Sequence, residues 1–116
     1  AQAAIDRMSD KFKGVPGLRF MQMDATNMSF EDASFDLAFE KGTFDAMYTG
    51  APDAVKQTVA QVFRVLRPGG VFISLTFGSP TARKDLNFTS GDPSLPSGWD
   101  QFVTKVIHKE EDASAE

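Results

Sequence analysis

The sequence predicts an α/β fold in which a partial, largely parallel sheet is flanked by helices. Short apolar runs that end in polar loops alternate with amphipathic segments, as strands and helices do in layered α/β proteins. The last clear run, Val71 to Phe77, is apolar with almost no alternation. Such a run is typical of a parallel strand that is covered on both faces.

The first element expected is an amphipathic helix within residues 1–14. Ile5, Met8 and Phe12 recur there at helical spacing. The Gly-Val-Pro-Gly run at 14–17 then ends the helix, because glycine and proline both interrupt helical backbone.

Two short strands should follow, each ending at a carboxylate. Leu18 to Met23 is an apolar run that ends at Asp24, and Phe35 to Phe39 is a second run that ends at Glu40. Residues 27–34 are polar and rich in turn formers, so we expect a loop between the two strands.

A second helix is the clearest element of the chain. Pro52 and Asp53 suit its first turn, and the Pro-Gly-Gly run at 68–70 stops it. Its apolar positions form one stripe: Val55, Val59, Val62, Phe63 and Leu66. The strand from Val71 to Phe77 comes next, and we expect Phe63, Phe72, Phe77 and the methionines in the core.

The C-terminal third is harder to interpret. Residues 78–98 are rich in Gly, Pro, Ser and Asp, which predicts a long irregular excursion. Trp99 to His108 fits either a helix or a strand, and its density of β-branched residues favours the strand. Residues 110–116 form a charged tail that we expect to be disordered. The chain is therefore divided into a partial domain at 1–109 and a tail at 110–116.

Composition excludes several classes of function. The 116 residues suffice for one domain and contain no Cys, which removes disulfides and thiolate chemistry. A formal net charge of −4 disfavours binding to nucleic acid, and no apolar run is long enough to cross a membrane. The single His has no ligand pattern around it, so no metal site is expected. We expect a cytoplasmic protein.

Polar residues follow the predicted strands at three places. These are Asp24-Ala25-Thr26, Glu40-Lys41-Gly42-Thr43 and Gly78-Ser79-Pro80. Ligands of open α/β sheets bind beyond the C-terminal ends of parallel strands. If the strands are parallel, these segments lie along one edge of the sheet and could form one crevice.

The string LRFMQMDATNMSFEDASFDLAFEKGTFDAM, with the later RVLRPGGVFISLTFGSP, resembles the class I S-adenosylmethionine-dependent methyltransferases. More narrowly, it is similar to the methyltransferase-like group that includes the elongation-factor-1-alpha lysine methyltransferases. The resemblance covers about residues 1–77 and fades after residue 80. It implies a partial Rossmann-like methyltransferase sheet, comprising about strands three to six of the family sheet, with flanking helices. It also implies S-adenosylmethionine as cofactor and a protein lysine as methyl acceptor.

The resemblance also implies roles for individual residues. Asp24 would bind the adenine amino group, and the Ala25 N–H would reach a ring nitrogen. Glu40, Lys41 and Gly42 would flank the methionine half of the cofactor.

The residues after this corner, Thr43, Phe44 and Asp45, would lie on the substrate side. Methyl transfer from a sulfonium is an in-line displacement that depends mainly on positioning and a deprotonated nucleophile. No general base is assigned. Glu40 and Asp45 are the candidate catalytic carboxylates, because either could orient or neutralise an approaching lysine ammonium.

Each of these residues also has a plainer interpretation. Asp24 could cap a turn, since Asp favours such positions. Glu40 and Lys41 could form a solvated ion pair, which would contribute little to stability. Asp45 could be a residue of a helix start.

The chain departs from the family pattern at its beginning. It has no G-x-G-x-x-G turn, and it starts at Ala1 with the helix that would follow the second strand of the family. We therefore expect the later part of a methyltransferase domain, a fragment that alone binds cofactor weakly or not at all. The alternative is a non-catalytic, truncated module that binds a protein partner or forms a homodimer covering its exposed sheet edges.

Overall fold

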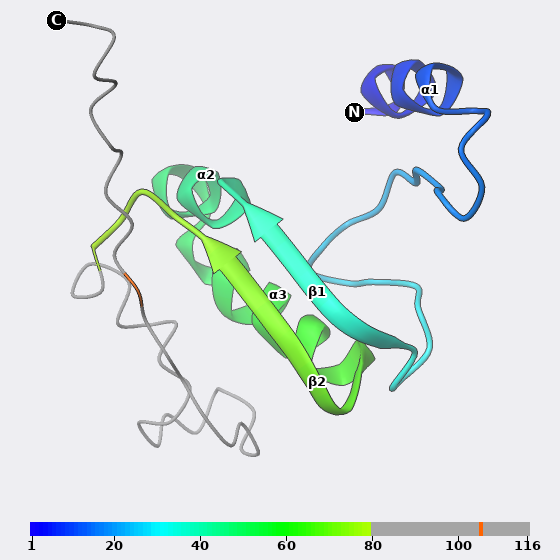
Figure 1. The fold of residues 1–116 in the computed structure, drawn as a ribbon. Helices are drawn as coiled ribbons and strands as arrows, with labels where there is room; N and C mark the ends of the chain where they lie inside the picture. The colour runs from blue at the N-terminus through cyan, green and yellow to red at the C-terminus, as the bar shows by residue number, and fades with distance from the viewer. Residues whose placement is uncertain (80–104, 106–116) are drawn as a thin grey trace, which may run out of the picture.

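The computed structural model describes residues 1–79 and residue 105. Its elements follow one another along the chain in the order shown in Figure 1: α1 (Gln2–Lys11), β1 (Phe35–Lys41), α2 (Thr43–Gly50), α3 (Pro52–Val65) and β2 (Leu66–Leu75). This is a mixed α/β arrangement with a small parallel sheet, as the sequence predicts.

The two strands pair in parallel. Leu37 lies opposite Val71, and Lys41 lies opposite Leu75. Parallel strands need a crossover connection, which α2 and α3 provide. Both helices lie on the same face of the sheet, behind the strands in Figure 1. The loop predicted at residues 27–34 is confirmed, since it contains no helix or strand.

The second predicted helix is α3, and its limits follow from local chemistry. Pro52 occupies the first turn, where its missing N–H is not needed, and Asp53 faces the positive end of the helix dipole. The helix ends at Val65, slightly earlier than predicted, because Leu66 already has extended backbone. The Pro-Gly-Gly run at 68–70 lies inside β2, where the pairing with β1 is irregular.

The core lies between the two crossover helices and the sheet. Phe44 of α2 is 1% exposed, and Val55 and Val59 of α3 are buried beside it. Phe72 of β2 packs against this cluster, with its ring 5.8 Å from that of Phe44 in an edge-to-face arrangement. The prediction that Phe72 belongs to the core is confirmed.

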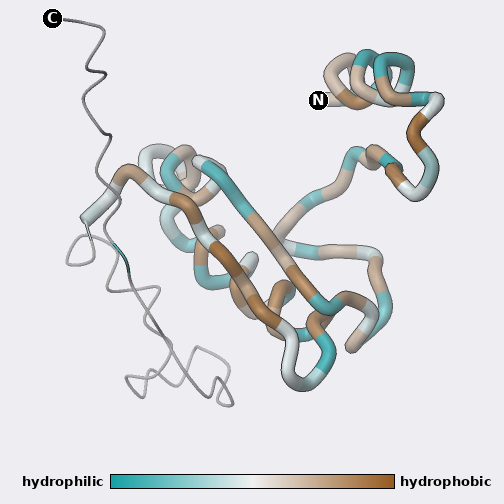
Figure 2. Tube along the Cα trace, in the orientation of Figure 1, coloured by the Kyte–Doolittle hydropathy of each residue, from teal (hydrophilic) through white to brown (hydrophobic). Residues whose placement is uncertain are grey.

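The opposite face of the sheet is apolar, and no helix or strand within residues 1–79 covers it, which corrects the expectation that Val71 to Phe77 is covered on both faces. Its side chains are between 40% and 61% exposed. We call this surface the uncovered face, and it consists of Leu37, Phe39, Val71, Ile73 and Leu75. Figure 2 shows many apolar residues along both strands. The side chains alternate between the faces, but both sets are apolar, so the sequence pattern is continuous.

Two further expectations are wrong. Leu18 to Met23 is not a strand, because no backbone hydrogen bond within residues 1–79 joins it to a neighbouring strand. Phe77 is not in the core but 94% exposed, since it lies beyond the end of β2.

The segment before β1 is set apart from the sheet. Figure 1 shows α1 at some distance from the strands, at the end of the extended segment that leads to β1. The helix itself is confirmed, although none of its residues is buried. Its end is held locally by stacking of the Phe12 and Phe20 rings, whose centroids are 5.9 Å apart.

The predictions for residues 80–104 and 106–116, which include the excursion, the third strand and the tail, lie outside the described residues. Within the described part, no helix is long and apolar enough to cross a membrane.

Substitution of Phe44 by alanine should lower the free energy of unfolding by about 3–5 kcal/mol, because it empties the centre of the core. Phe77→Ala, at a highly exposed phenylalanine, should change it by less than about 0.5 kcal/mol. Urea unfolding followed by circular dichroism measures both values. Equal losses for the two variants would contradict the described core.

Candidate functional site

The carboxyl ends of β1 and β2 meet at one edge of the sheet. Residues 40–43 form the turn at this edge, which we call the Glu40 corner. The two strands end side by side, at Lys41 and Leu75, and the Gly42 N–H donates a hydrogen bond of 3.1 Å to the Leu75 carbonyl. Gly42 has a φ of 77°, a conformation that favours glycine and turns the chain directly into α2. The segments that begin at Glu40 and Gly78 therefore lie at the same edge of the sheet, as expected for parallel strands.

Glu40 links this edge to the beginning of α2. Its Oε2 accepts hydrogen bonds from the N–H groups of Thr43 (3.0 Å) and Phe44 (3.3 Å), and its Oε1 accepts one from the Ser74 hydroxyl. A carboxylate at a helix N-terminus satisfies free N–H groups and interacts favourably with the helix dipole. Glu40 thus orders the corner where the resemblance expects the methionine half of the cofactor.

Lys41 does not form the ion pair with Glu40 that the sequence left open. It follows Glu40 on a strand, so its side chain projects from the other face of the sheet, where it is exposed. Within residues 1–79 it takes part in no ion pair. The amino group remains available to a ligand or to solvent.

Asp45 links the first turn of α2 to the end of β2 through hydrogen bonds. Its carboxylate accepts hydrogen bonds from the Phe77 N–H (3.0 Å) and the Thr76 hydroxyl. The interpretation of Asp45 as a residue of a helix start is confirmed. Of the neighbouring residues predicted on the substrate side, Thr43 is exposed, whereas the side chain of Phe44 belongs to the core.

Asp24 lies in a separate turn that it stabilises itself. Its Oδ1 accepts hydrogen bonds from the N–H (2.9 Å) and the hydroxyl (2.7 Å) of Thr26. These bonds, first the one from the hydroxyl and then the one from the N–H, lower the pKa of Asp24 and favour its ionised form. Asp24 therefore caps a turn, and its Oδ2 has no hydrogen-bond partner within residues 1–79. The Ala25 N–H likewise makes no hydrogen bond there.

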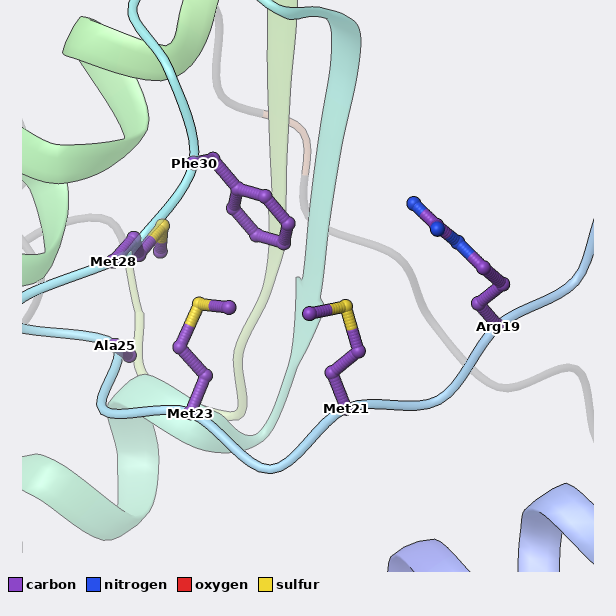
Figure 3. Close-up of a pocket in the computed structure, with 6 residues that line it drawn as sticks. All are labelled: Arg19, Met21, Met23, Ala25, Met28 and Phe30. Carbon is purple, nitrogen blue, oxygen red and sulfur yellow. The ribbon is translucent and has the colours of Figure 1, made fainter.

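Ala25 also lines a hollow that the sequence did not reveal. Its volume is about 330 Å³, and its walls are mostly apolar and rich in methionine. The lining residues are Arg19, Met21, Met23, Ala25, Met28 and Phe30. Figure 3 shows Met21 and Met23 extending from one segment toward Phe30 on the other. The three methionines at 21, 23 and 28 were the available signal, but they resembled ordinary core positions.

The expected single crevice is only partly assembled. No hydrogen bond or ion pair within residues 1–79 joins the Asp24 turn to the Glu40 corner, and Glu40, Lys41 and Gly42 do not line the hollow that contains Ala25. Their common role in cofactor binding stays a prediction. Among the described residues, there is also no group of three or more His, Asp or Glu side chains that could hold a metal ion.

Comparison with known proteins decides the family. A family described as a methyltransferase domain matches residues 1–74. The chain belongs to this family. The match confirms the resemblance to class I methyltransferases and extends over the Asp24 turn, the hollow and the Glu40 corner, ending within β2.

The relatives agree with the narrower resemblance. The chain is 41% identical over 86 residues to EEF1A lysine methyltransferase 4 of Mus musculus, a match that covers 66% of this chain and 34% of the relative. It is 38% identical over 93 residues to the Bos taurus protein of that name, covering 72% and 36%. The human eEF1A lysine and N-terminal methyltransferase is 40% identical over 65 residues, covering 53% and 9%. The chain thus spans about a third of the length of the first two relatives.

Glu40→Ala should destabilise the chain by about 1–2 kcal/mol, because it removes the acceptor for the first N–H groups of α2. Glu40→Gln keeps one acceptor oxygen and should cost less. Lys41→Ala, at the exposed neighbour, should leave the urea midpoint almost unchanged. A Lys41→Ala loss as large as that of Glu40→Ala would show that the described contacts of Glu40 do not stabilise the corner.

Proposed function

We propose that this chain is the later part of an S-adenosylmethionine-dependent methyltransferase that acts on a protein lysine in the cytoplasm. Membership of the methyltransferase-domain family supports the reaction type. The names of the relatives, which are lysine methyltransferases of elongation factor 1-alpha, support a protein lysine as acceptor. The net charge of −4 is compatible with a basic protein partner.

The single observation that supports cofactor binding most directly is the Asp24–Ala25 turn at the hollow. Asp24 has an ionised carboxylate whose Oδ2 accepts no hydrogen bond within residues 1–79. The Ala25 N–H has no partner there either. An acceptor and a donor on adjacent residues match the amino group and ring nitrogen of adenine. The methionines of the hollow suit a flat aromatic base, because thioether sulfur makes favourable contacts with aromatic rings.

The Glu40 corner would hold the methionine half of the cofactor and the acceptor. When bound, S-adenosylmethionine supplies an electrophilic methyl group on sulfur. The chain must then orient the approaching lysine ammonium, offset its positive charge, and align the amine with this group once the proton has been lost to solvent. Glu40 and Asp45 are held by their hydrogen bonds to α2 and β2, so their role in this proposal is to orient and to provide negative potential near Thr43.

Asp24→Ala in the whole natural protein should weaken binding of S-adenosylhomocysteine about tenfold or more, because it removes a hydrogen bond to a charged group. Asp53→Ala, an exposed carboxylate in the first turn of α3, is the matched control and should bind normally. Isothermal titration calorimetry and the ligand-induced rise in Tm measure the effect. A wild-type whole protein that S-adenosylhomocysteine does not stabilise would overturn the proposed function.

The second candidate is a non-catalytic module that forms a homodimer, and the uncovered face favours it. Five adjacent apolar side chains from two strands are about half exposed there. Contiguous apolar patches of this kind on a folded chain commonly mark interaction sites. A second copy could cover this face and the free strand edges together, although a stable interface needs roughly 800 Å² from each partner.

Light scattering of the chain alone tests this candidate. A dimer held by the uncovered face should become a monomer when Phe39 is replaced by aspartate, because an unpaired charge would be buried in the interface. Thr49→Asp, on the exposed side of α2, is the control and should leave the mass unchanged. A monomeric wild-type chain with cooperative unfolding would exclude obligate association.

A further inference from the structure

Arg64, in the last turn of α3, hydrogen bonds to the loop that precedes β1. Its Nη1 donates to the Phe30 carbonyl (2.7 Å) and to Asp32 Oδ1 (2.7 Å). Its Nη2 donates to the Met28 carbonyl (2.9 Å) and to Gln61 Oε1 (2.9 Å). A single planar guanidinium thus binds four acceptors, which is a geometry that lysine cannot reproduce.

Gln61 completes the connection one turn earlier on the same helix. Its Oε1 also accepts a hydrogen bond of 3.0 Å from the Met28 N–H. Both backbone polar groups of Met28 are therefore bound to α3. Further along the loop, the N–H groups of Ala33 and Ser34 donate to the carbonyls of Arg64 and Val65, at 2.9 and 2.8 Å. The loop is tied to the end of α3 over its whole length.

The two carbonyls that Arg64 binds belong to residues that line the hollow. Met28 and Phe30 form the side that faces Met21 and Met23 (Figure 3). We propose that Arg64 and Gln61 are positioning residues, which hold the Met28–Phe30 side of the hollow in the conformation that receives the adenine base. This inference rests on the proposed function, because it assigns the hollow to the nucleoside end of the cofactor.

The ion pair with Asp32 does not account for the arrangement. The Asp32 side chain is 78% exposed, and an ion pair with so exposed a partner contributes little to stability. The remaining acceptors of Arg64 are two main-chain carbonyls and an amide oxygen, all part-buried. Nor are Arg64 and Gln61 part of the core formed by Phe44, Val55 and Val59. Their contacts fix the loop, while the crossover helices and the sheet are held by other residues.

The test compares Arg64→Lys with Arg67→Lys in the whole natural protein. Arg67 is a good control because it lies three residues further on and makes one exposed ion pair, with Asp36 at 2.8 Å. Arg64→Lys should raise the Kd for S-adenosylhomocysteine about tenfold or more, since a lysine cannot reproduce the paired hydrogen bonds of the guanidinium to the Met28 and Phe30 carbonyls. Arg67→Lys should stay within about twofold of wild type. Asp32→Asn, which removes only the ionic partner, should also stay within about twofold.

The readout must separate positioning from mere stabilisation. Calorimetry well below Tm reports the Kd of the folded molecules, and steady-state kinetics should show a raised KM for S-adenosylmethionine with an unchanged KM for the protein acceptor. A lower Tm with an unchanged Kd would mean that Arg64 is only structural and would overturn the inference. If Arg64→Lys does not fold, Gln61→Met is judged by the same criteria. Wild-type protein that does not bind S-adenosylhomocysteine would instead overturn the proposed function itself.

Discussion

The parallel pairing of β1 with β2 is the constraint on which the rest of the described structure depends. Two parallel strands cannot be joined by a tight turn, so the chain must return along one face of the sheet through a crossover. Here α2 and α3 form that crossover, and their buried side chains create the core on the face they cover. The same constraint brings the two carboxyl ends together, which is why Glu40 can bind Ser74 and Asp45 can bind the backbone of Phe77.

The two carboxylates at this edge have structural roles that are compatible with the orienting role proposed for them. Glu40 satisfies the first N–H groups of α2, and Asp45 holds the end of β2. Both therefore remain ordered without a ligand, and their negative charge is fixed at the edge where ligands of parallel sheets bind. Fixed charges of this kind need no reorganisation when a cationic group approaches.

Sequence reasoning succeeded where local pattern determines structure. The apolar stripe of α3 between two apolar runs predicted the crossover, and the unbroken apolar run Val71–Phe77 predicted a parallel strand, from which the common edge followed. It failed for Leu18–Met23, because a strand exists only if another strand pairs with it, and propensity cannot supply that partner. It did not predict α2 as a separate helix, since Thr43–Gly50 is short and its start depends on Glu40 from the preceding strand. The hollow was missed because its two sides come from segments without regular structure.

The two sides of that hollow are held to very different degrees. The side that contains Met28 and Phe30 is fixed to α3 through Arg64 and Gln61. The side that contains Met21 and Met23 pairs with no strand among the described residues, and Met21 is half exposed. Binding to a surface that must first be ordered costs affinity, whereas a surface that is already ordered does not. The physical reason to expect weak nucleoside binding by this chain alone is therefore the unpaired Leu18–Met23 segment, since the Asp24 turn beyond it already has its local hydrogen bonds in place. A strand paired with that segment would stiffen the loose side without adding any contact to the base.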